Sequence, residues 1–146
     1  MKQMQAQDGL LHWSDGDGAP ARSLSAPLLE SHQTQEAHLW AVRSDDVVHA
    51  IEHCAFGSGL ESGVIKHTNL TGGSPAYSGG ELLFLPDGTL VLNGCSGRYG
   101  PRTKNELDSV AKAFAKSGYG VWCMGFDEET NRPARFIGTH PEWVAA

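Results

Sequence analysis

Residues 80–93, GELLFLPDGTLVLN, contain the clearest pair of strands in the chain, and the predicted fold is built outward from them. Two largely apolar runs, residues 80–85 and 89–93, flank the sequence PDG, which has the composition of a tight turn between antiparallel strands. Residues 82–85 are apolar without alternation, as is typical of a strand that is covered on both faces. We therefore predict a β-hairpin whose first strand is buried on both sides.

A helix is predicted after the hairpin, and the sequence marks where it starts. Thr103 and Glu106 have the T-x-x-E spacing of a capping box, and apolar residues then recur at helical spacing up to the expected end at Gly118. Two further strands are predicted over residues 119–126 and 134–138, separated by the turn-forming sequence DEETNRP.

Before the hairpin, the pattern predicts a strand over residues 38–43 and another over residues 63–70. Between them, apolar residues at helical spacing favour a helix that is capped by Ser44 and ends at Gly57. The order β-α-β-β-β-α-β-β predicts an α+β fold, with an antiparallel β meander packed by two helices. This single domain is expected over residues 38–146.

The first 37 residues differ in composition from the rest. They are rich in Gln, Ser, Asp, Gly and Pro, and their apolar residues occur only in small groups. We therefore expect residues 1–37 to form an N-terminal arm that is partly disordered, with one short segment that packs onto the domain.

Composition limits the function classes. The chain of 146 residues has a net charge of −6, which argues against broad, non-specific binding to nucleic acid. The sequence has no 18-residue apolar stretch, and its start lacks the apolar run of a signal peptide. Its three cysteines form no CxxC pair, so a disulfide framework or a zinc site is not expected. We expect a cytoplasmic protein without membrane contact, or an effector that is delivered by a non-classical secretion route.

Four residues have the side chains of an acid–base site. They lie in or beside three successive predicted strands: His67 in the first, Glu81 at the start of the second, and Arg98 and Tyr99 after the third. Successive strands are neighbours in a meander. One of His67 and Glu81 would take a proton while the other gives one, and Arg98 would stabilise negative charge. In the structural alternative, His67 is hydrogen-bonded in the core and Glu81 is a solvated strand end. As a set, the four residues are the predicted catalytic group.

Cations gather at the start of the second predicted helix. Arg98, Arg102 and Lys104 lie near Thr103, where free amide hydrogens and the helix dipole favour an anion. This pattern predicts a phosphate or carboxylate site, and the alternative is that the cations pair with acidic side chains of the same helix, Glu106 and Asp108. The other residues expected to contact the substrate flank His67 or follow the hairpin: Thr68, Asn69, Gly72, Gly73 and Ser96. We expect no metal and no cofactor, because HAIEH (residues 49–53) lacks both the HExxH pattern and a third ligand.

Residues 65–101, IKHTNLTGGSPAYSGGELLFLPDGTLVLNGCSGRYGP, resemble a known module. It contains H-S-S-F-L-A-G-G, then A-G-E-L, then S-G-H-Y-x-P, and is found at the C-terminal ends of bacterial polymorphic toxins and in plant IQ-motif calmodulin-binding proteins. The matching positions are His67, Thr68, Gly72 and Gly73, then Gly80, Glu81 and Leu82, then Ser96, Gly97, Tyr99 and Pro101. Arg98 stands where the module has His, and a guanidinium cannot exchange a proton as an imidazole can. The resemblance covers about a quarter of the chain and implies a toxin- or effector-like enzyme, without fixing the reaction.

Two enzymatic hypotheses follow. The first is a metal-independent endoribonuclease of the toxin type, because microbial ribonucleases use a similar set to His67, Glu81 and Arg98, here with a further His140, on an antiparallel sheet. The second is NAD-dependent ADP-ribosyl transfer or NAD hydrolysis, with NAD as the cofactor. Its motif would be His67-Thr68, then Tyr99, then a late acid, Glu128 or Glu129.

The third hypothesis is not enzymatic. The glycine-rich loops would form the recognition surface of a ligand-binding or immunity-type protein, and the strand edge and acidic charge would suit binding to a basic toxin or to a nucleotide. The expected partners are therefore a phosphate-bearing substrate (RNA or a nucleotide) under the enzymatic hypotheses, and a cognate toxin or immunity protein under this one.

Overall fold

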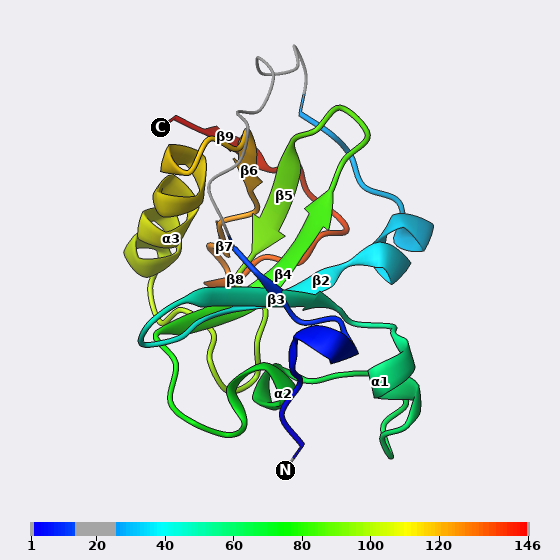
Figure 1. Cartoon of the computed structure of the whole chain (residues 1–146). Coiled ribbons are helices and arrows are strands. Elements are labelled where there is room, and N and C mark those ends of the chain that lie inside the picture. Colours follow the sequence, from blue (N-terminus) through cyan, green and yellow to red (C-terminus); the bar gives the residue numbers. More distant parts are fainter. Residues whose placement is uncertain (1, 14–25, 146) are drawn as a thin grey trace.

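The computed structural model describes residues 2–13 and 26–145, and the predicted β-hairpin lies at its centre (Figure 1). β4 (Ser78–Phe84) and β5 (Leu90–Asn93) pair in antiparallel register. In the turn between them, Asp87 accepts hydrogen bonds from the amide and the hydroxyl of Thr89, and Gly88 adopts a left-handed φ of 88°. Leu82 and Leu83 are both buried although they point to opposite faces, so β4 is covered on both sides, as predicted.

Among the described residues, seven strands form one sheet in the order β1-β3-β2-β4-β5-β6-β9. The remaining strands of this sheet are β1 (Leu11–His12), β2 (His38–Val42), β3 (Val47–Ile51), β6 (Val121–Cys123) and β9 (Glu142–Val144). All neighbouring pairs are antiparallel except β5 and β6, which are parallel and joined by a helical crossover. A separate small hairpin is formed by β7 (Phe126–Asp127) and β8 (Arg132–Pro133). The fold is a single α+β domain with a mostly antiparallel sheet, which confirms the predicted fold class.

The crossover helix is α3 (Lys104–Lys116), and its start is the predicted one. The Thr103 hydroxyl accepts a hydrogen bond from the Glu106 amide at 3.2 Å, while the Glu106 carboxylate accepts one from the Arg102 amide at 2.8 Å. The other helices are short: η1 (Ala6–Asp8), η2 (Ser31–Glu36), α1 (Ala55–Ser58) and α2 (His67–Thr71). In the described part of the chain, no helix combines the length and apolar character that crossing a membrane requires.

The helix predicted from Ser44 to Gly57 is wrong, because residues 47–51 form β3, an antiparallel partner of β2. The connection between the two strands is a tight turn, closed by a hydrogen bond from the Arg43 amide to the Asp46 carbonyl. The run VVHAI is rich in β-branched residues, and its pairing with two strands outweighs the helical spacing of its apolar residues. Only the short α1 remains helical in this region.

The strand predicted over residues 63–70 is also wrong, because its second half forms α2. The side chain of Asn69 accepts a hydrogen bond from the Lys66 amide at 2.8 Å, which satisfies an amide at the start of this helical turn. Gly72 ends the helix with a left-handed φ of 67°. A short helix was not expected here, because an isolated helix of five residues is intrinsically unstable and depends on tertiary contacts.

The predicted C-terminal strands are displaced. The strand expected over residues 119–126 divides into β6 and β7, and the strand expected over residues 134–138 is a loop between β8 and β9. The meander is also interrupted, since β2 lies between β3 and β4 and β6 runs parallel to β5. The loop over residues 134–138 is nevertheless fixed, because the buried Phe136 packs beneath the sheet together with Leu83 and Trp122.

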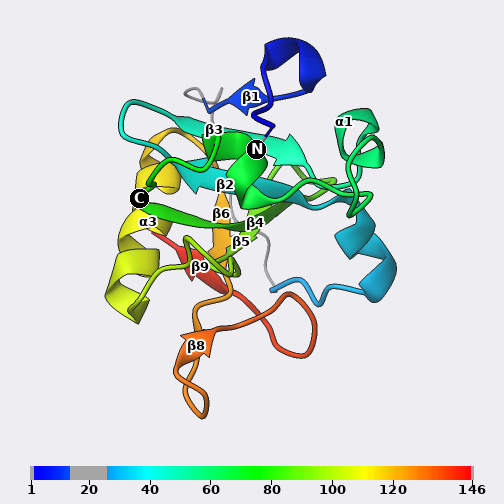
Figure 2. The same ribbon diagram turned by 90° about the horizontal axis from the view of Figure 1, so that it is seen from below.

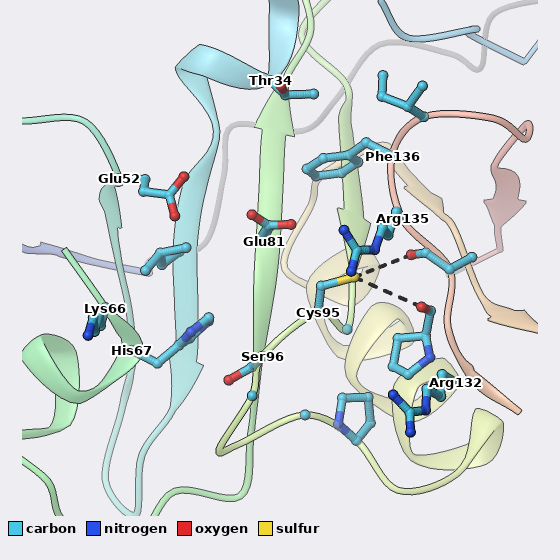
Figure 3. A pocket seen from close by; sticks show the side chains of 18 of the residues that line it. Thr34, Glu52, Lys66, His67, Glu81, Cys95, Ser96, Arg132, Arg135 and Phe136 are labelled. Atoms are coloured by element: carbon cyan, nitrogen blue, oxygen red, sulfur yellow. Dashed lines mark hydrogen bonds between the residues drawn. The ribbon is translucent and has the colours of Figure 1, made fainter. Parts of the chain in front are cut away.

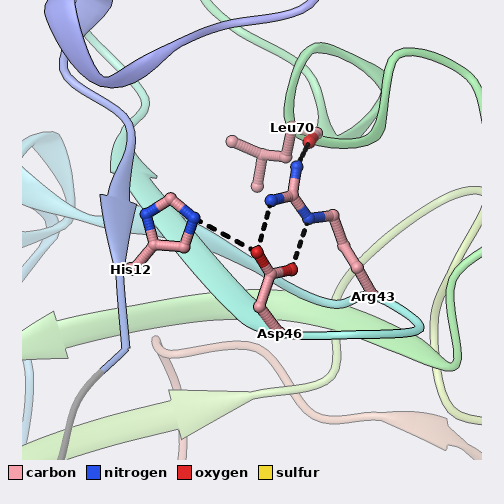
Figure 4. Close-up of polar contacts among 4 residues, drawn as sticks. All are labelled: His12, Arg43, Asp46 and Leu70. Carbon is pink, nitrogen blue, oxygen red and sulfur yellow. Dashed lines mark hydrogen bonds and ion pairs between the residues drawn. The ribbon is translucent and has the colours of Figure 1, made fainter.

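The described parts of the N-terminal region contribute to the core. Met4, Leu10 and Leu29 are buried, and the Met4 amide donates to the carbonyl of Asn69 in α2 at 2.8 Å. β1 is held at the sheet edge partly by His12, whose Nε2 lies 3.1 Å from Oδ2 of Asp46 (Figure 4). Residues 14–25, which belong to the arm predicted over residues 1–37, lie outside the described residues.

The two faces of the sheet are covered differently (Figure 2). On one face, α3 packs over the centre, with Leu107 and Phe114 against Trp40 and Leu92. The other face carries two separate clusters. One lies around α2 and the N-terminal segment, and the other lies around Phe136 and the segment before β2. The space between these two clusters holds the candidate site.

Candidate functional site

A cleft of about 1450 Å³ lies between α2 and the loop that follows β8 (Figure 3). Its lining includes His67 and Thr68 from α2, Glu81 from β4, and the loop after β5 with Ser96 and Arg98. The cleft therefore contains three of the four predicted catalytic residues. Apart from the histidines, the cleft has four positively charged residues and three negatively charged ones. The first are Lys66, Arg98, Arg132 and Arg135, and the second are Glu52, Glu81 and Asp127. The cleft is thus locally cationic in a chain of net charge −6.

Glu81 projects from β4 between Glu52 and Arg135 (Figure 3). Burial is the main effect on its carboxyl and raises the pKa. Asn93 Nδ2 donates a hydrogen bond to Oε1 at 3.1 Å, which lowers the pKa, and the charge of Glu52 raises it. Arg135 lowers this pKa by a smaller amount, and the net shift is upward. Glu81 is therefore not a solvated strand end. A carboxyl whose pKa is raised keeps its proton to a higher pH than an ordinary glutamic acid, and is therefore suited to give a proton.

His67 stands on α2 with its ring against β4. Nε2 lies 2.8 Å from the carbonyl oxygen of Gly80, and a carbonyl can only accept, so Nε2 carries the proton and Nδ1 of the neutral ring is unprotonated. Burial lowers the pKa of His67, and the hydrogen bond to Gly80 offsets this in part. Among the described residues, none forms a hydrogen bond with Nδ1. Nε2 and Cδ2 are the ring atoms that face Gly80 and Gly79 of β4, and Nδ1 lies on the opposite side of the ring.

Gly79 explains how His67 comes to lie on the face of the sheet that carries Glu81. Residues 79 and 81 point to the same face of β4, because side chains alternate along a strand. A Cβ atom at Gly79 would lie 3.1 Å from Cδ2 of His67 and 3.1 Å from Cβ of Tyr99. The absence of a side chain at this position therefore makes room for both side chains beside Glu81.

The opposite wall of the cleft is formed by β8, which carries Arg132, and by the loop that follows it, which carries Arg135 (Figure 3). The thiol of Cys95 donates a weak hydrogen bond to the carbonyl of Ala134 at a distance of 3.6 Å, which attaches the loop to the end of β5. Burial, followed by the charge of Glu81, raises the pKa of Cys95 to about 11. This thiol is therefore protonated at neutral pH and is a structural group at this wall.

Arg98 lies at the rim of the cleft, away from its floor. Its side chain is exposed, Nη2 donates to the carbonyl of Gly73 at 3.1 Å, and the guanidinium lies 5.4 Å from the ring centre of Tyr99. Tyr99 itself is only 7% exposed and does not line the cleft. Its hydroxyl donates to the carbonyl of Ser74 and lies 2.9 Å from Oγ1 of Thr71, so its proton is already used in a structural network.

Of the cations predicted to surround the start of α3, Arg102 and Lys104 do not line the cleft. Lys104 Nζ pairs with Asp108 Oδ2 at 2.9 Å, and Thr103 is occupied by its capping hydrogen bond. Arg102 instead lines a second, smaller pocket of about 270 Å³ beside the cleft, and Arg98 lines both pockets.

The other predicted substrate contacts divide into two groups. Thr68 and Ser96 line the cleft, and Oγ of Ser96 also accepts the amide of Tyr99 at 3.1 Å. Asn69, by contrast, is buried, and its amide group donates to the carbonyl of Lys2 at 2.7 Å. Gly72 and Gly73 form the end of α2 and do not line the cleft.

Sequence reasoning missed several residues of the site, chiefly Arg132 and Arg135. The sequence NRPAR contains both, and two arginines separated by a proline-containing turn are the one local signal that could have indicated an anion-binding loop. Among the described residues, no three His, Cys, Asp or Glu side chains lie close enough together to hold a metal ion.

No family model matches the chain, and the searches of curated proteins and of solved structures found no match either.

Proposed function

We propose that the cleft is the active site of an enzyme that cleaves RNA phosphodiester bonds without a metal ion. One observation supports this most strongly. An imidazole with a lowered pKa and a carboxyl with a raised pKa lie on one face of β4, opposite two arginines. Groups whose surroundings favour their neutral forms can exchange protons with a substrate near neutral pH.

The directions of the two pKa shifts assign the roles. His67 is neutral, with Nδ1 free among the described residues, and takes the proton of the ribose 2′-hydroxyl. The 2′-oxygen then attacks phosphorus, forming the 2′,3′-cyclic phosphate as the bond from phosphorus to the 5′-oxygen breaks. Glu81, in its protonated form, gives its proton to the leaving 5′-oxygen. His67 gains one proton and Glu81 loses one, so the cleavage step balances, and proton exchange with water returns both residues to their starting forms before the next turnover.

The arginines would supply the charge stabilisation. Arg132 and Arg135 line the wall opposite β4, and a guanidinium presents paired N–H groups to phosphate oxygens. Arg98, at the rim, replaces the His of the module that the sequence resembles. It would bind the substrate phosphate and take no part in proton transfer. The local cationic character of the cleft would attract an anionic substrate despite the acidic chain.

The NAD hypothesis ranks second. Tyr99 is buried with its hydroxyl engaged, and neither Glu128 nor Glu129 lines the cleft, so the order His-Tyr-Glu does not converge on one site. The third hypothesis, a binding or immunity-type protein, would use the same cleft without turnover.

The test is incubation of the purified chain with single-stranded RNA and, separately, with NAD, followed by mass spectrometry of the products. We expect RNA fragments that end in 2′,3′-cyclic phosphate, and intact NAD. Release of nicotinamide would favour the NAD hypothesis. Intact RNA and NAD, together with measurable nucleotide binding, would favour the binding hypothesis.

A further inference from the structure

A second pocket adjoins the cleft and has the side chains of a nucleotide subsite. Its volume is about 270 Å³, and Tyr77, Arg98, Arg102 and Glu106 are among the residues that line it. Arg98 lines this pocket and the cleft, so the two are connected along one surface. Of the 11 lysines and arginines in the chain, five line the two pockets: Lys66, Arg98, Arg102, Arg132 and Arg135.

Tyr77 is unusually exposed to solvent for a large aromatic residue. The residue is 75% exposed, the largest exposed fraction among the large hydrophobic residues that the structure describes. Within the described residues, its ring makes no hydrogen bond and no ring contact. Its backbone is nevertheless fixed, because its amide donates to the carbonyl of Val42 at 2.8 Å and β4 begins at the next residue. The chain thus holds an exposed aromatic ring on a rigid strand end.

The neighbouring arginines complete the arrangement. The guanidinium of Arg98 is held over Tyr99 and by the Gly73 carbonyl, whereas that of Arg102 makes no hydrogen bond or ion pair with the described residues. The negative charge in this pocket comes from Glu106, whose carboxylate accepts the backbone amide of Arg102. An aromatic platform beside two guanidinium groups is the pattern by which proteins bind a single strand of nucleic acid, with a base stacked on the ring and the backbone along the cations.

We infer that this pocket is a subsite for single-stranded RNA, in which Tyr77 stacks on a base one nucleotide beyond the two that flank the scissile phosphate, and Arg98 and Arg102 contact the phosphate that joins this nucleotide to the strand in the cleft. The inference rests on the proposed RNA cleavage, because the cleft supplies the reacting end of the same strand. Stacking on a tyrosine ring tolerates any base, so the subsite favours longer substrates without selecting a sequence. A dinucleotide that fills only the cleft would not use it.

The experiment measures binding and cleavage separately. Binding of a fluorescein-labelled RNA hexanucleotide is followed by fluorescence anisotropy in the full chain carrying Glu81→Gln, which keeps the substrate intact. Tyr77→Ala is added to this background, with Tyr77→Phe as the variant that retains the ring. Leu28→Ala is the matched control, because it removes another apolar side chain that is 62% exposed but lines neither pocket. Cleavage of a dinucleotide is measured in the otherwise wild-type chain with and without Tyr77→Ala.

We expect Tyr77→Ala to raise the Kd of the hexanucleotide at least about fivefold, which corresponds to the lower end of the free energy of stacking one base on an aromatic ring. Tyr77→Phe and Leu28→Ala should bind as the parent does, and dinucleotide cleavage should be unchanged. An unchanged Kd for Tyr77→Ala, alongside normal dinucleotide cleavage, would overturn the subsite and leave the proposed function standing. If the wild-type chain cleaves no RNA and the parent binds none, both proposals are overturned.

Discussion

Nε2 of His67 lies 2.8 Å from the carbonyl oxygen of Gly80, the residue that immediately precedes Glu81. This hydrogen bond fixes the tautomer of the imidazole and holds α2 against β4. Because the bond ends on the neighbour of Glu81, it also determines where the imidazole stands relative to the carboxyl. The arrangement of the proposed acid–base pair thus depends on a short helix and a strand that are separated by a glycine-rich loop.

The pH dependence of cleavage follows from the two pKa shifts. His67 must be neutral to take a proton, so activity should rise as the pH rises through its pKa, which is lowered from 6.5. Glu81 must be protonated to give one, so activity should fall as the pH rises through its pKa, which is raised from 4.5. We expect a bell-shaped profile of kcat/KM, with the rising limb centred below pH 6.5 and the falling limb centred above pH 4.5. An activity that keeps rising into alkaline pH would contradict Glu81 as the proton donor.

Gly79→Ala should impair activity more than stability. The added methyl group would lie 3.1 Å from both Cδ2 of His67 and Cβ of Tyr99, and would displace the imidazole by a few tenths of an ångström or more. We expect cleavage efficiency to fall about 10- to 100-fold, since small displacements of a catalytic group are costly. Gly59→Ala is the control, because the nearest atom to its added Cβ is 3.5 Å away and outside the cleft. Equal activities of the two variants would show that the position of His67 is unimportant.

Cys95→Ala should retain cleavage activity within a few fold. A thiol with a pKa of about 11 has only about 0.01% thiolate at pH 7, too little for a nucleophile. The substitution loosens the attachment of the loop that carries Arg135 and follows Arg132 in β8, because the hydrogen bond to Ala134 is lost. The main effect should therefore be weaker substrate binding, seen as a higher KM, with little change in the turnover rate. A turnover rate that drops by about two orders of magnitude would instead indicate covalent catalysis by Cys95.

The parts of the fold that were predicted correctly are those in which local signals and long-range contacts agree. The hairpin over residues 80–93 has turn chemistry and apolar strands, and α3 has a capping residue at Thr103 and a buried stripe. The segment 47–51 has helical spacing, but its pairing with β1 and β2 makes it a strand, and a single sequence does not reveal its partners. The helix α2 was missed for the same reason, because it depends on contacts with Met4 and β4.

The candidate site was predictable in part. His67, Glu81 and Arg98 were selected by residue type and by their glycine-rich surroundings, and all three line the cleft. The three residues were expected to lie close together because residues 63–70 were predicted to be a neighbouring strand. In the structure, His67 instead reaches β4 from the helix α2. Arg132 lies in β8 and Arg135 in the loop that follows it, both distant in sequence from β4, and no local pattern shows that this segment lies opposite β4.

The histidine pair formed by β2 and β3 predicts a loss of stability in acid. Nδ1 of His38 lies 3.0 Å from Nδ1 of His49, and burial, followed by the charge of His38, lowers the pKa of His49 to about 4. The unfolded chain takes up a proton on this histidine near pH 6.5, whereas the folded chain does so only near pH 4. The free energy of unfolding is therefore highest above pH 6.5 and decreases as the pH falls towards 4. The expected loss in the free energy of unfolding is on the order of 3 kcal/mol.

Urea denaturation at a series of pH values measures this effect, and His49→Leu is the comparison because it removes the titrating group. The variant should show a shallower dependence on pH between 6.5 and 4. Parallel curves for the two proteins would exclude the histidine pair as the cause.

The most direct test of the proposed function is the cleavage rate of an RNA oligonucleotide by the wild-type chain and by Glu81→Gln, with melting temperatures measured on the same samples. Glutamine keeps the oxygen that accepts the Asn93 hydrogen bond but has no proton to give. We expect the turnover rate to fall by at least about two orders of magnitude while the melting temperature changes little. If the variant is equally active, or if the wild-type chain leaves RNA intact, the assignment of Glu81 as the acid of a ribonuclease is contradicted.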